Sequence, residues 1–162
     1  MAEEQAPQPQ FEIQRVYVKD MSLEMPGNVE LFKQQWVPKT HIDLNVTNDE
    51  LEQDHYEVVL RATVEVKNGE QKVLVIEAKQ AAIFRLNGFE KEQLDHMLRA
   101  YCPNILFPYV REIISDVSVR ASFAPITLAP VNFEAIYLQQ KQQEEADGKT
   151  EETGGKKGGA GG

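Results

Sequence analysis

The sequence is poor in cysteine, in positive charge and in long apolar runs. Cys102 is the only cysteine among 162 residues, which excludes an internal disulfide. The 17 Lys and Arg residues face 26 Asp and Glu residues, and the net charge of −9 argues against a nucleic-acid partner, since phosphates require a basic surface. No apolar run approaches the roughly 18 residues of a membrane span, and the polar start MAEEQAPQPQ is unlike a secretory signal. We therefore expect a cytoplasmic protein without membrane insertion, with basic or neutral partners.

Residue patterns for catalysis or for metal and cofactor binding are also missing. His41, His55 and His96 follow no metal-ligand spacing, and the internal glycines stand alone rather than in a phosphate-binding loop. Cys102 lies beside Pro103 in an apolar run, where a buried, unreactive thiol is commoner than a nucleophile. We predict no enzyme and no cofactor. The alternative is a small cysteine-dependent enzyme, which loss of turnover in a Cys102→Ala variant would support.

The composition is that of one soluble globular domain with flexible ends. Hydrophobic residues make up 41% and charged residues 27% of the chain, which is long enough to bury a core. Residues 1–10 are rich in Gln, Glu and Pro, and we predict that they are disordered. The apolar residues thin out after residue 139, and the chain ends in Gly and Lys. The prediction is an ordered domain at 11–142 and a flexible tail at 143–162.

Four strand patterns occupy the first half of the domain: FEIQRVYVKDMSLEM, KTHIDLNV, YEVVLRATVEV and KVLVIEAKQAAIF. The last three are rich in alternating apolar residues, as in strands of an antiparallel sheet. In the first pattern, a simple alternation places Phe11, Ile13 and Tyr17 on one face. It places Val16 and Val18 on the other.

The Asn-Gly pair between the last two strands leaves their register open. A two-residue loop at Asn68-Gly69 would set Leu60 opposite Glu77, whereas a three-residue loop ending at a left-handed Gly69 reverses the parity. We favour the second register because it gathers apolar side chains on one face: Leu60, Ala62, Leu74, Ile76 and Ala78. The opposite face is then mixed and able to bind a partner: Val59, Val73, Val75, Arg61, Glu65, Glu77 and Lys79.

Helical patterns follow the strands. FEKEQLDHMLRAY predicts a helix that Pro103 ends, and we expect Pro108 to open the next helix, because a missing N–H is harmless in a first turn. A last helix is predicted to begin at Asn132, a residue type favoured as an N-cap. The segment between these helices, SFAPITLAPV, is an unusually apolar loop interrupted by prolines.

The helix predicted over residues 105–121 has an apolar face that spans an arc of roughly 180° at about 100° per residue. Burial of each of these side chains contributes about 1.5–3 kcal/mol, so they should not remain in water. One sheet covers only one side of a helix, and we therefore predict that a second copy covers the rest. The alternative is a helix buried within one chain. The residues concerned are Ile105, Leu106, Tyr109, Val110, Ile113, Ile114 and Val117.

Four segments strongly resemble the SecB protein-export chaperones of bacteria: FEIQRVYVKDMSLEMP, YEVVLRATV, AYCPNILFPYVRE and LAPVNFEA. The resemblance covers Phe11 to about Leu138, and it departs at Ala81-Ala82, where a Gly pair is common, and in the Gly/Lys tail. It implies an α+β fold with a four-stranded antiparallel sheet and two main helices per subunit. It also implies a homotetramer, assembled as a dimer of dimers.

The resemblance further implies a holding chaperone without ATP, which binds unfolded preproteins in the cytoplasm and delivers them to the SecA motor. Asp20, Glu24, Val75 and Glu77 match positions that the family uses to dock SecA. The alternative function is that of a SecB-like chaperone dedicated to a toxin–antitoxin pair.

A protein that holds many sequences needs wide apolar grooves rather than one shaped pocket. The resemblance implies that Phe32 and Trp36, with the segment SFAPITLAPV, form the groove walls. Further apolar lining is expected from Ile42, Leu44, Phe84, Phe123 and Tyr137. Core packing is the alternative role for each of these residues, since grooves and cores use the same residue types.

Overall fold

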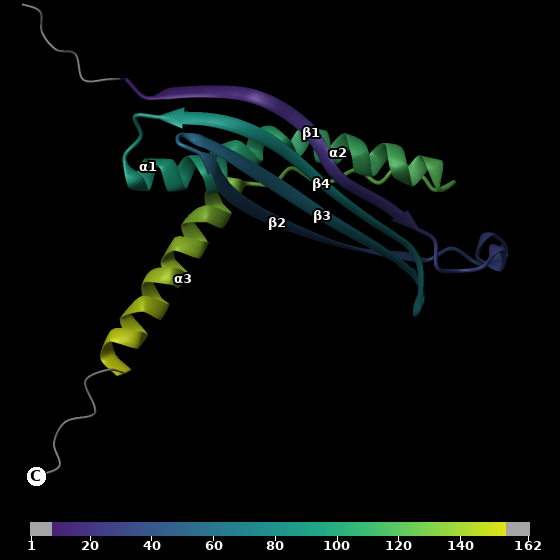
Figure 1. Ribbon diagram of the computed structural model, residues 1–162. Coiled ribbons are helices and arrows are strands. Elements are labelled where there is room, and N and C mark those ends of the chain that lie inside the picture. The colour runs from purple at the N-terminus through teal and green to yellow at the C-terminus, as the bar shows by residue number, and fades with distance from the viewer. Residues whose placement is uncertain (1–7, 155–162) are drawn as a thin grey trace, which may run out of the picture.

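The computed structural model describes residues 8–154, with side chains as far as residue 149. A four-stranded antiparallel sheet in the order β1-β4-β3-β2 carries a long helical rod on one face (Figure 1). This arrangement confirms the predicted sheet with two main helices. The strands are β1 (Gln10–Glu24), β2 (Pro38–Glu52), β3 (His55–Asn68) and β4 (Gln71–Asn87). The helices are η1 (Val29–Lys33), α1 (Lys91–His96), η2 (Met97–Tyr101), α2 (Cys102–Arg120) and α3 (Phe133–Gly154).

The rod is formed by α1, η2 and α2, which follow one another without a break. The predicted helix end at Pro103 and the predicted start at Pro108 are therefore wrong. A π-helical segment, η2, precedes Pro103, and the Cys102 N–H donates to the Met97 carbonyl five residues back. Pro108 lies inside α2 and removes one helical hydrogen bond. Packing of α2 on the sheet outweighs that local cost.

The core lies between the rod and the sheet face formed by β3 and β4. A segment at 121–132 then returns along α2 (Figure 1). Leu128 of this segment is buried, and the Ile126 N–H donates to Ser118 Oγ at 3.0 Å. The Phe107 and Phe133 rings meet at 6.0 Å between centroids and close the end of the segment. Fully buried side chains from both layers include Leu60, Val64, Ile76, Leu106, Val110 and Ile114.

The apolar face of α2 is covered largely within one chain. Tyr109 is 46% exposed and Ile105 is partly buried, but the other five residues of the predicted interface are buried by the sheet and the returning segment: Leu106, Val110, Ile113, Ile114 and Val117. The width of this face is therefore no argument for a second copy. These five residues follow the alternative, a helix buried within its own chain.

The β3–β4 hairpin has the predicted pairing of faces but a different turn. Asn68 pairs with Gln71, so the loop contains two residues, and Gly69 has the expected left-handed conformation with φ of 64°. A β-bulge at Val73 then restores the predicted parity, in which Ala62 faces Ala78. The prediction of a three-residue loop was therefore wrong. Val73, predicted on the mixed face, is fully buried in the core.

Two β-bulges in β1 alter the predicted faces of that strand. The register shifts between Ile13 and Arg15, which places Val16 on the core side with Phe11 and turns Tyr17 to the opposite face. The grouping of Phe11 with Tyr17 was therefore wrong, because each bulge reverses the two-residue alternation. A second shift lies between Val18 and Asp20, where the buried Gln80 donates from Nε2 to the Tyr17 carbonyl at 3.0 Å.

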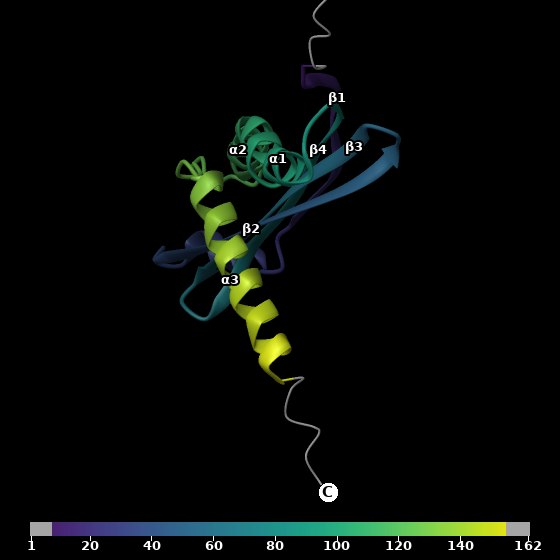
Figure 2. The ribbon, with the colours of Figure 1, turned by 90° about the vertical axis from the view of Figure 1, so that its left-hand side faces the viewer.

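Helix α3 projects beyond the sheet (Figures 1 and 2). Asn132 Oδ1 accepts from the Ala135 N–H at 3.0 Å, which confirms the predicted N-cap. The domain boundary at 142 stays a prediction: α3 continues past it to Gly154. Most of the predicted disordered start and the end of the predicted tail, residues 1–7 and 155–162, lie outside the described residues. Within residues 8–154, no helix is long and apolar enough to cross a membrane.

Candidate functional site

Three aromatic rings from separate segments gather at one end of the molecule. Phe123, from the segment after α2, lies 5.1 Å from Trp36 and 6.4 Å from Phe32 between ring centroids. Trp36 is 42% exposed and Phe32 is 55% exposed. We call this group the aromatic pocket, and the three residues were all predicted to line the groove. Such exposed aromatic surface is characteristic of a binding site.

The aromatic pocket is held by hydrogen bonds at its edges. The Asn68 side chain brackets Trp36: its Oδ1 accepts from the Val37 N–H at 2.9 Å, and its Nδ2 donates to the Gln35 carbonyl at 3.1 Å. Asn68 was predicted only as a turn residue, and no local pattern indicates this long-range contact. Ser122, with φ of 70°, ends α2 in a left-handed conformation and turns the chain into Phe123.

Two adjoining cavities share Trp36, Phe123 and Ala124 as lining residues. The first opens between η1 and the end of α2, and the second continues toward the start of β2. Both walls are mainly apolar, and they come from the two segments named for the groove. The remaining lining residues are Leu31, Phe32, Gln34 and Ser122 in the first cavity, and Pro38, Thr40, Val66, Pro125 and Ile126 in the second.

The other residues predicted for the groove divide into two groups. Ile42 and Leu44 lie on β2, on the sheet face that carries the rod, and Ile42 is 39% exposed. Phe84 is fully buried in the core against Phe11, and Tyr137 of α3 is buried against His96 of the rod. Phe84 and Tyr137 therefore take no part in the aromatic pocket. For these two residues the structure follows the core-packing alternative.

The face of the sheet away from the rod, here called the outer face, gathers the four positions predicted to dock SecA. Asp20 of β1 pairs with Lys79 of β4, and Glu24 pairs with Val75. Glu77 lies between those two pairs on β4, opposite Ser22. Asp20 and Glu24 reach this face because the second bulge in β1 reverses the alternation after Val18.

Charged groups on the outer face form local pairs. Arg61 Nη2 lies 3.1 Å from Glu77 Oε2, and Lys19 Nζ lies 2.6 Å from Glu57 Oε1. The hydrogen bonds from Lys19 and Tyr17 lower the pKa of Glu57. Burial and the hydrogen bond to Glu57 raise the pKa of Tyr17 to about 12. The outer face thus carries paired positive and negative side chains rather than a uniform acidic patch.

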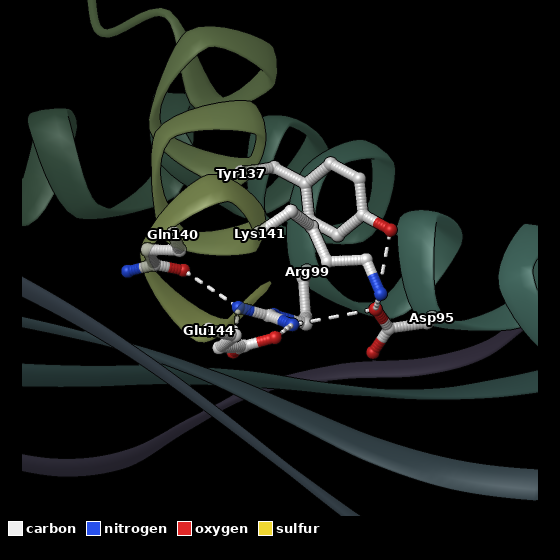
Figure 3. Close-up of polar contacts among 6 residues, drawn as sticks. All are labelled: Asp95, Arg99, Tyr137, Gln140, Lys141 and Glu144. Atoms are coloured by element: carbon white, nitrogen blue, oxygen red, sulfur yellow. Dashed lines mark hydrogen bonds and ion pairs between the residues drawn. The ribbon is translucent and has the colours of Figure 1, made fainter. Parts of the chain in front are cut away.

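A polar cluster joins the root of α3 to the rod (Figure 3), and we call it the α3 clasp. Asp95 Oδ2 accepts from the Tyr137 hydroxyl at 3.1 Å and lies 3.3 Å from Arg99 and 3.5 Å from Lys141. Arg99 also donates to Glu144 at 2.9 Å. Burial and the contact with Asp95 raise the pKa of Tyr137. The clasp accounts for a tyrosine at a position predicted to be apolar groove lining.

Cys102 is fully buried, and burial raises the pKa of its thiol to about 12. Burial thus disfavours the thiolate, which is the nucleophilic form. The three histidines lie apart, with Asp43 beside His41, Glu134 beside His96, and Gln14 and Gln53 beside His55. The polar contacts of the three histidines are thus with carboxylate, amide and carbonyl groups.

One sheet separates the aromatic pocket from the charged outer face. The family model for preprotein translocase subunit SecB matches residues 4–144. A protein-export protein SecB of Psychrobacter arcticus is 49% identical over 91% of this chain and 99% of its own length. The protein-export protein SecB of Pseudomonas syringae pv. tomato is 47% identical over 88% of this chain and 87% of its own length. That of Legionella pneumophila (strain Corby) is 46% identical over 89% of this chain and 90% of its own length. The chain belongs to the SecB family.

A solved structure has a similar fold. It is the SecB-like chaperone of Mycobacterium tuberculosis in complex with a peptide from an antitoxin. The match has a TM-score of 0.61 and 16% identity, and it covers 75% of this chain and 90% of the other. At this identity the likeness concerns the fold alone.

Proposed function

We propose that this chain is an ATP-independent export chaperone, which holds unfolded preproteins in the cytoplasm and delivers them to the SecA motor. Family membership carries this proposal, since relatives with 46–49% identity over most of both chains are protein-export proteins. The proposal predicts that the purified chain suppresses aggregation of a denatured preprotein without ATP and binds SecA. Failure to suppress aggregation would contradict it.

The client site is the aromatic pocket. Its rings present apolar surface without a closed shape, which suits a binder of many sequences. The pocket adjoins β2, an edge strand of the sheet, so that an extended client segment could also pair with the free backbone edge. Ile42 and Leu44 on β2 would extend the apolar contact along that client segment.

The SecA-docking site is the outer face around Asp20, Glu24, Val75 and Glu77. The exposed carboxylates of Asp20 and Glu24 suit a basic segment of the partner, and the open sheet face leaves room for a broad contact. The outer face lies on the opposite side of the sheet from the rod. A client at the aromatic pocket would leave this face free for SecA.

The assembly that we propose is a homotetramer, a dimer of dimers. Support comes from apolar side chains that a single subunit leaves exposed, on edge strand β1 and on the rod: Ile13, Val18, Met21, Leu23, Tyr101, Tyr109 and Val119. Light scattering should give a mass four times that of the 18.4 kDa chain. A monomeric mass at micromolar concentration would contradict the tetramer.

A chaperone dedicated to a toxin–antitoxin pair is the less favoured function. The solved SecB-like chaperone with an antitoxin peptide shares the fold at 16% identity, whereas the protein-export relatives exceed 45% identity. A competition assay separates the two functions. Tight binding of an antitoxin segment, together with no suppression of preprotein aggregation, would reverse the assignment.

A further inference from the structure

The outer face contains cations among its carboxylates. One cross-strand row runs from Asp20 on β1 through Lys79 on β4 to Arg61 on β3, because Lys79 is the register partner of both neighbours. Glu77 and Glu24 follow in the next two rows toward the hairpin. A cationic segment that approaches these three carboxylates therefore meets two positive charges at the centre of the same surface.

The two cations differ in how they are engaged. Arg61 is paired with Glu77 at 3.1 Å, which offsets its charge. Among the side chains described up to residue 149, Lys79 has no ion pair, although opposite charges on directly facing residues commonly interact. Lys79 is partly buried in the middle of the central strand β4, with a free positive charge next to Asp20.

This placement gives Lys79 a repulsive effect on cations at the docking site. Side chains that face each other across paired strands have Cβ atoms about 4.5–5.5 Å apart, well within the screening length of about 10 Å at 0.1 M salt. A partner with positive charge at every position would be repelled by Lys79. A partner whose cations reach Asp20 and Glu24, and which presents an uncharged or acidic group to Lys79, would not be repelled.

We propose that Lys79 is a specificity-determining residue of the outer face, which disfavours indiscriminate polycations relative to SecA. Such repulsive elements distinguish partners that share one attractive feature, here positive charge. The part concerning SecA rests on the proposed docking function. The part concerning polycations rests only on the row Asp20–Lys79–Arg61.

The test compares the full-length chain with Lys79→Gln, using SecA and a 20-residue polylysine peptide as ligands. At about 0.05 M salt, the variant should bind polylysine about three- to fivefold more tightly. The gain for SecA should be smaller, so that the ratio of the two affinities shifts toward polylysine. At 0.5 M salt the difference should vanish through screening. Lys79→Arg, which keeps the charge, should behave as the original chain.

The matched control is Lys91→Gln at the start of α1, which removes the same charge away from β1 and β4. If both glutamine variants gain the same affinity for polylysine, only the net charge of the chain matters and the inference is overturned. Unchanged or weaker polylysine binding by Lys79→Gln would also overturn it. If the original chain does not bind SecA while Lys79→Gln gains polylysine affinity, the role of Lys79 stands and the docking function fails.

Discussion

The guanidinium carbon of Arg99 lies 5.2 Å from the centre of the Tyr137 ring, and this contact joins the π-helical segment η2 to α3. Arg99 is mostly buried, and it also binds Asp95 on α1 and Glu144 on α3 (Figure 3). Within the described side chains of α3, only Phe133 and Tyr137 are buried. The position of the helix beyond Tyr137 therefore depends on polar contacts.

Removing Arg99 should release this part of α3. Arg99→Gln loses the link to Glu144 and the charge over Tyr137, and a polar helix without tertiary contacts is marginal in water. We expect backbone amides at 138–149 to exchange with deuterium at least about tenfold faster. Arg120→Gln, which breaks the exposed pair with Asp116, is the control and should leave α3 protected. Equal exchange in both variants would contradict a role for the clasp.

Trp36→Ala distinguishes pocket from core. Trp36 is 42% exposed, so its loss should cost much less stability than the about 3–5 kcal/mol expected for a buried aromatic residue. Client affinity should fall tenfold or more, since aromatic anchors contribute about 2 kcal/mol to binding. Thermal melting and titration with an unfolded preprotein measure both quantities. Phe84→Ala, at a fully buried aromatic, is the control for stability. A large fall in melting temperature for Trp36→Ala with unchanged affinity would place Trp36 in the core.

The double variant Asp20→Ala/Glu77→Lys should weaken SecA docking and leave client holding intact. Asp20 and Glu77 lie on the outer face, away from the aromatic pocket. Added salt should weaken docking of the original chain, because exposed charges are screened within about 10 Å at 0.1 M. Equal SecA affinity of the two proteins, measured at low salt, would count against this surface.

The contact between Tyr17 and Glu57 predicts a pH dependence of stability. The pKa of Tyr17 is raised from 10.0 to about 12 in the folded chain. The folded state therefore holds a proton that the unfolded state has lost in this window, and stability falls as the pH rises from 10 to 12. Tyr17→Phe should flatten this alkaline decline in urea-unfolding experiments. A decline of unchanged slope would show that other groups cause it.

Regular alternation allowed much of the sheet to be predicted, and interruptions of it were missed. The shared face of Ala62 and Ala78 was predicted by gathering apolar side chains on one side of the sheet, because burial fixes parity. The bulge at Val73, which produces that parity, leaves no local signal. The second bulge in β1 lies beside a contact with a distant residue, Gln80, and the first bulge interrupts the alternation between Ile13 and Arg15. A count along the strand therefore assigned Tyr17 to the wrong face.

The candidate site was predicted in part for a related reason. The resemblance to the SecB family implied Phe32, Trp36 and Phe123 as groove lining, and the fold brings their rings together. Phe84 has the same chemistry on a central strand, where the core takes it. The prolines of α2 were read as helix boundaries by their local cost, which packing against the sheet outweighs. For such residues, tertiary packing overrides the local conformational preference that the sequence shows.

The second bulge in β1 decides which side chains this strand presents on the outer face. Lys19 is the extra residue of the bulge, between Val18 opposite Gln80 and Asp20 opposite Lys79. If β1 instead took Lys19 into a regular ladder, Asp20 and Glu24 would point toward the rod, and Met21 and Leu23 would point outward in their place. One irregularity in the hydrogen bonding therefore separates a carboxylate surface from an apolar one, with every residue of the chain unchanged.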